Sequence, residues 1–178
     1  MTWRNERIVE IPIIWKIVEK YHRKKILEVG DVLSHYFSVD YKILDKYSKT
    51  DGIIQQDVVD YKSTTKYDLI VSISTLEHVG WDEKMREPMK VMHAIENLKS
   101  LLSKKGKLVV SIPLGYNQDM DKLLKENKIK FTKQYYLKRI SKDNKWIEIN
   151  QDDAFTIKYG TPFCNANGLI IGIISNVN

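Results

Sequence analysis

The stretch Lys66–Glu83, KYDLIVSISTLEHVGWDE, decides the fold of this chain. Its first half, Tyr67–Ile73, is an aliphatic and β-branched run, which is typical of a strand buried on both faces of a parallel sheet. The run stops in a polar cluster that comprises Ser74, Thr75, Glu77 and His78. Because ligands of open α/β sheets bind outside the carboxyl ends of the strands, this cluster indicates a ligand site. For His78 alone, a solvated residue in a helix cap is an equal alternative.

The same stretch resembles a known motif. Its pattern Asp-Leu-Ile-Val-Ser-(x)3-Leu-Glu-His-Val, residues 68–79, is similar to the fourth-strand motif of class I S-adenosylmethionine-dependent methyltransferases, especially the small-molecule enzymes in which Leu-Glu-His-Val follows that strand. The resemblance extends over roughly residues 25–116, about half of the chain. It implies an α/β, Rossmann-like class I methyltransferase fold. Such a fold has a mostly parallel sheet in the order 3-2-1-4-5-7-6, an antiparallel last strand and helices on both faces.

Helical and extended patterns alternate along the chain, as expected for such a sheet. We expect helices that begin at Pro12, Pro88 and Asn117, the second of them closed by Gly106, and a brief helix over Val32–Phe37. We expect strands over Ile26–Gly30, Tyr41–Leu44, Ile53–Asp57, Tyr67–Ile73, Leu108–Ile112 and Leu169–Ser175, with a hairpin of Tyr135–Ile140 and Trp146–Ile149. The third strand follows the second too closely for the roughly dozen residues of a parallel crossover. The helix between them is therefore predicted to be missing or reduced to a turn.

Length and cysteine content indicate one ordinary domain. The 178 residues suffice for a core, so residues 1–178 are predicted to form a single methyltransferase-like domain. Cys164 is the only cysteine, which excludes an internal disulfide, and no cluster of Cys and His indicates a metal site. A reducing cytoplasm is the expected location. Gly160 and Pro162 interrupt the uncharged C-terminal run and the N-terminus lacks a signal-peptide pattern, so no membrane segment is predicted.

The net charge of +6 resides in part between Lys122 and Lys145, where lysines alternate with apolar residues. A solvated lysine face is the more common meaning of such a pattern. An anionic partner, nucleic acid included, is the alternative. Because no motif that reads DNA or RNA accompanies the lysines, nucleic acid is ranked second to a small-molecule acceptor as the partner. The sequence gives no indication of an oligomeric state.

The segment Ile26–Gly30, ILEVG, resembles the start of the cofactor loop of the methyltransferases. The resemblance implies S-adenosylmethionine as the cofactor. Glu28 would hold the ammonium of its methionine moiety, and Gly30 would let the backbone turn tightly beside it. The alternating glycines of the family stop there, because Val32 and Ser34 occupy the second and third positions. The same departure makes a nicotinamide-type GxGxxG loop unsuitable, since that loop needs its glycines for the pyrophosphate.

Two aspartates at predicted strand ends complete the implied cofactor site. Asp45 resembles the acidic residue that binds both ribose hydroxyls, a task that suits a carboxylate because it accepts two hydrogen bonds side by side. Asp57 resembles the residue that holds the adenine amino group, with Val58 against the ring. Thr75 and Leu76 would contact the cofactor through their backbone. Each aspartate taken alone is more often a turn residue or a helix cap.

Candidate acceptor residues follow the fourth and fifth predicted strands. Trp81 and Asp82 could form the wall of an acceptor pocket, since an aromatic face and a carboxylate suit a polar ring or an amine. Packing of Trp81 on the sheet edge and capping by Asp82 are the alternatives. Tyr116 and Asn117 occupy the position after the fifth strand where such enzymes often place acceptor-facing residues.

Methyl transfer needs positioning of the acceptor and removal of one proton when the acceptor is a hydroxyl or an ammonium. His78 is the first candidate base and Glu77 the second, while a purely structural His78 stays open. The predicted function is therefore an S-adenosylmethionine-dependent methyltransferase that acts on a small-molecule acceptor. A non-catalytic binding or scaffold domain and a nucleic-acid methyltransferase are the alternatives.

Overall fold

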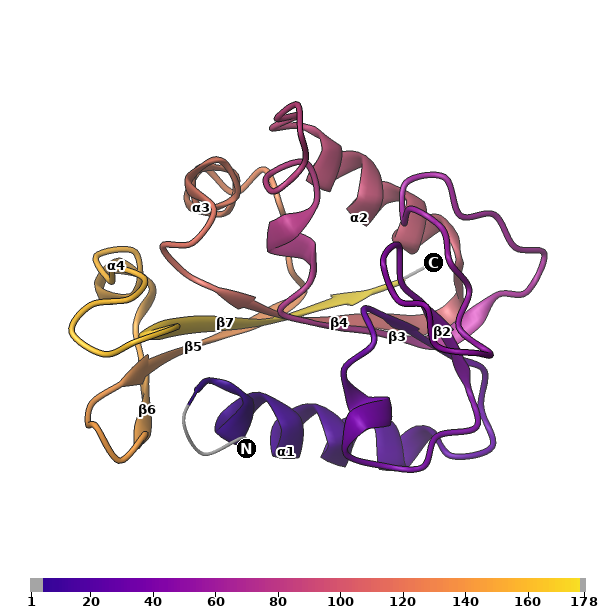
Figure 1. The fold of residues 1–178 in the computed structure, drawn as a ribbon, viewed down its shortest axis with the longest axis horizontal. Helices are drawn as coiled ribbons and strands as arrows, with labels where there is room; N and C mark the ends of the chain where they lie inside the picture. Colours follow the sequence, from indigo (N-terminus) through magenta and orange to yellow (C-terminus); the bar gives the residue numbers. More distant parts are fainter. Residues whose placement is uncertain (1–4, 177–178) are drawn as a thin grey trace.

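A seven-stranded mixed sheet with helices on both faces forms the centre of the computed structural model, which describes residues 5–176 (Figure 1). The strands are β1 (Ile26–Val29), β2 (Lys42–Leu44), β3 (Tyr67–Ile73), β4 (Leu102–Pro113), β5 (Lys133–Arg139), β6 (Trp146–Ile149) and β7 (Gly168–Ser175). The α-helices are α1 (Arg7–Val18), α2 (Lys90–Ser100), α3 (Gln118–Lys125) and α4 (Gln151–Ala154). Short 3-10 helices are η2 (Glu19–Tyr21), η3 (Leu33–His35) and η4 (Leu76–His78).

The strand order is β2-β1-β3-β4-β7-β5-β6, which confirms the predicted class I methyltransferase topology. Strands β2, β1, β3 and β4 are parallel, and β7 runs antiparallel to both β4 and β5. The predicted hairpin is present as β5 and β6, and β6 forms one edge of the sheet. Because β7 is antiparallel, its first residues lie at the same edge of the sheet as the carboxyl end of β4.

The predicted third strand is reduced to a single bridge, in which Ile54 pairs with Leu44. Two hydrogen bonds hold it there, from the Ile54 nitrogen to Ile43 and from the Asp45 nitrogen to Ile54. The prediction of a strand over Ile53–Asp57 is thus wrong in extent, because the chain returns from β2 within a short turn and no crossover helix lifts it over the sheet. The segment keeps its expected place beside β2.

Strand β3 is the centre of the sheet and separates two apolar layers. Leu69, Val71 and Ile73 pack with α1 below the sheet, whereas Tyr67 and Ile70 belong to the cluster beneath α2 and α3. All five side chains are at least 99% buried. Each buried aliphatic side chain contributes roughly 1.5–3 kcal/mol relative to its exposed state. Burial on both faces explains why the sequence of this strand does not alternate between apolar and polar residues.

Two helix boundaries differ from those that the sequence predicts. Helix α1 begins at Arg7, so Pro12 lies inside it. The proline removes one backbone donor, and the carbonyl of Ile8 that would accept from it belongs to an exposed residue. Helix α2 ends at Ser100, and Gly106 lies within β4, where an added Cβ would come within 2.5 Å of the Tyr67 carbonyl oxygen. Gly106 therefore permits the close approach of β3 and β4 and does not end the helix.

The N-terminus of α3 follows the prediction. The Asn117 side chain accepts a hydrogen bond from the Met120 nitrogen and caps the helix. The predicted brief helix after β1 is present as η3. Within residues 5–176, no helix combines the length and the apolar character that a membrane crossing requires.

Candidate functional site

A cavity of about 380 Å³ opens at the carboxyl ends of β1, β2 and β3. It is lined by the loop after β1, the turn after β2, the bridge segment and η4. The lining includes the predicted site residues Gly30, Asp45, Asp57, Val58, Thr75, His78 and Asp82. A volume of this size lies in the ordinary range for small-molecule sites. The structure thus brings together residues that are more than 50 positions apart in the sequence.

Gly30 forms the floor of the cavity beside β3. Its φ of +90° is a conformation that side chains rarely adopt, and an added Cβ would lie 2.1 Å from Thr75 Oγ1. Thr75 itself donates from its hydroxyl to the Ile73 carbonyl. The first glycine of the loop is therefore required by the close approach of the ends of β1 and β3.

Glu28 lies beneath the loop and does not line the cavity. Its carboxylate is fully buried and accepts from the backbone nitrogens of Val32 and Leu33 and from the Tyr41 hydroxyl. Burial raises the pKa of Glu28, while these two backbone hydrogen bonds oppose the rise. The Glu28 side chain thus fixes the segment around Val32, where the methyltransferase motif that the sequence resembles would have its second glycine.

Asp45 faces the cavity from the end of β2. One carboxylate oxygen accepts from the backbone nitrogens of Tyr47 and Ser48, both at 2.7 Å, and the other accepts from the Asp31 nitrogen at 3.1 Å. An ionised carboxylate has about four acceptor positions, so a ligand hydroxyl can still be bound. The turn after β2 therefore holds Asp45 in a fixed orientation toward the cavity.

Asp57 belongs to a cluster of four charges at the rim of the cavity, which we call the rim cluster: Lys46, Asp57, Glu83 and Lys90. Lys46 lies 2.8 Å from Asp57 and 3.0 Å from Glu83, and Lys90 lies 2.9 and 2.7 Å from the same two carboxylates. Partial burial opposes ionisation of Asp57, but hydrogen bonds from both lysines prevail and lower its pKa to about 2. Asp57 is thus ionised, and two lysines already bind it.

Acidic side chains dominate the lining of the cavity. Carboxylates from Asp31, Asp45, Asp57, Asp82 and Glu83 line it, whereas Lys46 is the one lysine among the lining residues, all of which the structure describes. Such a lining attracts a cationic ligand and repels phosphate groups. The electrostatics therefore favour a ligand with positive charge near the ends of β1 and β3.

His78 lines the cavity from the end of η4 and is oriented by a carboxylate. Its Nδ1 lies 2.5 Å from Asp82 Oδ2, and the same oxygen accepts at 2.8 Å from the Tyr116 hydroxyl. Partial burial opposes ionisation of Asp82, and the hydrogen bonds from His78 and Tyr116 prevail and lower its pKa. The Tyr116 ring also contacts His78 edge to face at 5.0 Å. The arrangement is that of an imidazole held by an ionised carboxylate.

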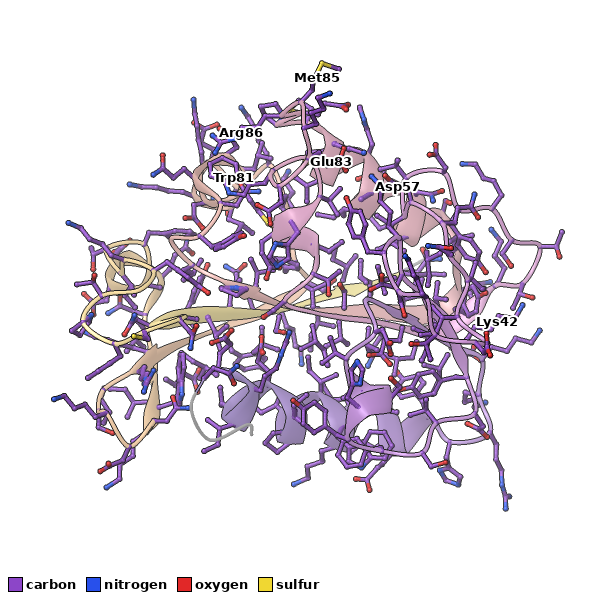
Figure 2. The ribbon with its side chains drawn as sticks, in the orientation of Figure 1. Lys42, Asp57, Trp81, Glu83, Met85 and Arg86 are labelled. Carbon is purple, nitrogen blue, oxygen red and sulfur yellow. The ribbon has the colours of Figure 1, made fainter. Side chains whose placement is uncertain are left out.

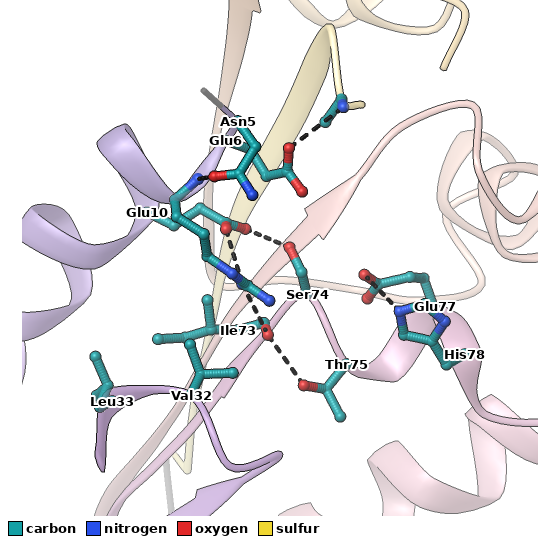
Figure 3. Close-up of polar contacts among 12 residues, drawn as sticks. Asn5, Glu6, Glu10, Val32, Leu33, Ile73, Ser74, Thr75, Glu77 and His78 are labelled. Carbon is teal, nitrogen blue, oxygen red and sulfur yellow. Dashed lines mark hydrogen bonds and ion pairs between the residues drawn. The ribbon is translucent and has the colours of Figure 1, made fainter. Parts of the chain in front are cut away.

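Glu77 is buried, does not line the cavity and lies beside the His78 ring (Figure 3). Its Oε1 lies 3.6 Å from His78 Nε2, while Oε2 is buried without a hydrogen-bond partner among residues 5–176. Burial raises the pKa of Glu77 well above its usual range, and the nearby Glu10 adds to the rise. Glu77 is therefore a buried acid beside the imidazole, and its burial favours the protonated form.

The remaining predicted residues lie outside the cavity lining. Leu76 is buried in the core, and Trp81 packs beneath the Arg86 guanidinium at 3.8 Å, above the sheet in Figure 2. Asn117 is buried, and its amide nitrogen donates to the Glu77 carbonyl at 2.7 Å while its oxygen caps α3. Asn117 thus ties the loop after β4 to η4, and of the two candidates there only Tyr116 reaches the His78 pair.

Sequence reasoning did not find three charged residues of this region. The position of Lys46 directly after Asp45 could have indicated its role. No pattern in the sequence indicates Lys90, because α2 brings it to the rim. Glu10 lies four residues before Ile14 on the buried face of α1, where a carboxylate is unusual. It pairs with Arg7 at 2.9 Å and accepts from Ser74 Oγ at 2.5 Å. This link ties α1 to the end of β3.

Comparison with known proteins places the fold. No protein-family model and no curated protein sequence matches the chain. Among solved structures, it is similar to the N-methyltransferase NodS from Bradyrhizobium japonicum WM9 in complex with S-adenosyl-L-homocysteine. The TM-score is 0.56 at 12% identity, over 97% of this chain and 92% of NodS. It is also similar to a methyltransferase from Thermotoga maritima, a possible histamine N-methyltransferase, with a TM-score of 0.50 at 10% identity over 96% and 97% of the two chains. The chain has the fold of these S-adenosylmethionine-dependent methyltransferases.

Proposed function

We propose that this chain is an S-adenosylmethionine-dependent methyltransferase that acts on a small-molecule acceptor. One observation carries the proposal: in a methyltransferase fold, a carboxylate-lined cavity opens at the ends of β1, β2 and β3, with an oriented histidine at its wall. That the structurally similar NodS was solved with S-adenosyl-L-homocysteine supports the same cofactor here.

The residues present suit this cofactor. Gly30 and Thr75 line the cavity, Asp45 can accept from ribose hydroxyls, and Val58 offers an apolar wall. The acidic lining suits a ligand that carries a sulfonium and an ammonium. Dinucleotides are a poor match because their pyrophosphate would face carboxylates. We assign Asp57 to the rim cluster and not to the cofactor. Its two carboxylate oxygens already accept hydrogen bonds, one from Lys46 and Lys90 and the other from the Val59 nitrogen.

S-adenosylmethionine, when bound, supplies an electrophilic methyl group on its sulfonium. The work of the chain is then to orient the acceptor and to take up one proton. Asp82 accepts from His78 Nδ1, which leaves the lone pair on Nε2 to receive that proton. The same carboxylate stabilises the imidazolium that results. Tyr116 holds Asp82 in place through its hydroxyl.

The competing function is a scaffold domain that kept the fold and lost the cofactor. Isothermal titration calorimetry with S-adenosylmethionine and S-adenosyl-L-homocysteine separates the two. We expect saturable binding of both, and a loss of roughly tenfold to a hundredfold in affinity for Asp45→Asn, because a hydrogen bond to a charged group contributes about 1.5–3 kcal/mol. Asp143→Asn, in the exposed β5–β6 turn, is the matched control and should bind as the wild type does. Absence of heat at millimolar ligand would favour the scaffold.

A further inference from the structure

A second groove opens beside β5 and the loop that precedes β7. It has a volume of about 480 Å³ and is lined by Lys138, Arg139, Ile140, Thr156, Ile157, Lys158, Thr161, Pro162, Phe163 and Asn167. Strand β5 runs antiparallel to β7, and β7 antiparallel to β4, so β5 ends at the same edge of the sheet as β4. The groove therefore opens at the edge where the carboxylate-lined cavity lies.

The groove is cationic. Lys138, Arg139 and Lys158 line it, and none of its lining residues, all of which lie in the described part of the chain, is acidic. The carboxylate-lined cavity has the opposite character. The two openings at one edge of the sheet thus prefer ligand groups of opposite charge.

The wall of the groove is built around Arg139, which is 94% buried. Its guanidinium donates to the carbonyls of Ser141, Lys142 and Cys164 at 3.0–3.1 Å and lies 4.8 Å from the Phe163 ring centre. No ion pair within residues 5–176 includes Arg139. Because the Arg139 guanidinium is hydrogen-bonded to neutral carbonyls, no negative charge balances its positive potential at the groove.

The adjoining loop is fixed as well. Asn167 is buried, and its amide donates to the carbonyls of Phe163 and Asn165 while accepting from the Phe163 nitrogen. Lys158 and Thr161 form a bridge across the turn that contains Tyr159. The two exposed lysines, Lys138 and Lys158, therefore project from a rigid rim.

Aromatic rings connect the groove with the candidate base. Tyr159, the neighbour of Lys158, contacts the Tyr116 ring edge to face at 5.1 Å, and Tyr116 contacts His78 at 5.0 Å. Two rings thus span the surface between the groove and His78. An acceptor lying across Tyr159 and Tyr116 would reach both places at once.

We propose that this groove binds a phosphate group of the methyl acceptor, so that the acceptor is a small phosphorylated molecule. The inference rests on the proposed function and names the substrate class of that site. The phosphate binds between Lys138 and Lys158, against the Arg139 wall. Hydrogen bonds from the two ammonium groups to the phosphate oxygens are charge-assisted and therefore stronger than those between neutral groups. The acidic cavity repels the same group, so the acceptor binds in one orientation, with its nucleophile toward His78.

The test uses inorganic pyrophosphate as the probe at physiological salt, followed by amide chemical shifts in nuclear magnetic resonance. We expect saturable shifts at Lys158, Thr161 and Asn167. The double variant Lys138→Gln/Lys158→Gln should weaken pyrophosphate binding by at least about tenfold, given the worth of hydrogen bonds between charged groups. The matched control Lys104→Gln/Lys105→Gln removes two exposed lysines of β4 outside the groove and should bind as the wild type does.

The result separates this inference from the proposed function. S-adenosyl-L-homocysteine binding, measured by calorimetry, should be the same in the double variant and the wild type. Pyrophosphate binding without S-adenosyl-L-homocysteine binding would leave the groove standing and overturn the methyltransferase proposal. Shifts spread over all lysines, or equal losses in both double variants, would overturn the groove. A single-stranded oligonucleotide that binds more than a hundredfold tighter than pyrophosphate would replace the small acceptor with nucleic acid.

Discussion

At the scale of single residues, His78 is the side chain whose role depends most on its neighbours. Asp82 lies at Nδ1 and carries charge, whereas Glu77 lies toward Nε2 and is buried with a pKa well above its usual range. The pKa values of the two carboxyl groups are thus shifted in opposite directions although both groups adjoin one imidazole. Asp82 holds the ring through Nδ1 and can stabilise the imidazolium that forms when Nε2 accepts a proton.

His78→Ala should lower methyl-transfer turnover by about 10²- to 10⁴-fold, the loss expected for a general base. The affinity for S-adenosyl-L-homocysteine should change little, because the floor of the cavity at Gly30 and Thr75 is untouched. Turnover is measured with an identified acceptor and affinity by calorimetry. His35→Ala, at the exposed His35 of η3, is the control and should retain turnover. If His78→Ala instead loses the cofactor or unfolds at a lower temperature, His78 is structural and positioning alone accounts for the rate.

At the scale of elements, the rim cluster links segments that lie far apart in the sequence. Lys46 follows β2, Asp57 follows the bridge segment, Glu83 follows η4 and Lys90 begins α2. Figure 2 labels Asp57 and Glu83 on the α2 side of the sheet. Alternating charges at 2.7–3.0 Å connect these four segments above the apolar cluster to which Leu44, Val58 and Val91 belong.

Acid should weaken this connection. The pKa of Asp57 is about 2 in the folded chain and 3.8 ordinarily, so folding favours the ionised form. Its contribution is complete above pH 4 and is lost as the pH falls toward 2. We expect the wild type to lose about 1–2 kcal/mol of unfolding free energy through Asp57 in that window, a value reduced for the partly exposed Lys46. Urea unfolding at several pH values measures it.

Two variants isolate the effect of Asp57. Asp57→Asn should be less stable than the wild type near pH 6, and the difference should shrink as the pH approaches 2. Asp143→Asn, at an exposed turn, is the control and should follow the wild type throughout. A constant difference between Asp57→Asn and the wild type at every pH would mean that packing, and not charge, is responsible.

At the scale of the whole molecule, one sheet joins every described helix and strand into two apolar layers (Figure 1). The larger layer extends from Val58 near the cavity to Ala154 in α4, across α2 and α3. Continuous layers of this kind are typical of a single cooperative unit. The proposed single domain over residues 1–178 rests on this continuity.

Thermal unfolding should therefore proceed in one transition. S-adenosyl-L-homocysteine at a hundred times its dissociation constant should stabilise the folded chain by about 2.7 kcal/mol. For a chain of this size, that corresponds to a rise in Tm of roughly 5–10 °C. Differential scanning calorimetry measures both quantities, and Asp45→Asn at the same ligand concentration should show a smaller rise. Two separate transitions would contradict the single domain.

The sequence by itself determined the central strand and the places where polar residues follow the strand ends, and its resemblance to the methyltransferase motifs implied the strand order. Tyr67–Ile73 could be predicted because burial on both faces demands a local apolar run. Gly30 and Asp45 could be predicted because they directly follow such runs, and His78 because it belongs to the polar cluster after one. These signals are local, so no knowledge of distant residues was needed.

The tertiary structure alone decided which of those residues line the cavity and which hold the fold. The Glu28 carboxylate accepts hydrogen bonds from the backbone nitrogens of Val32 and Leu33. These contacts depend on the path of the loop after β1. Lys90 meets Asp57 across 33 positions, and Ser74 meets Glu10 across 64. A carboxylate binds whatever donor the fold brings within about 3 Å of it, and that donor is set by packing between segments rather than by the sequence around the carboxylate.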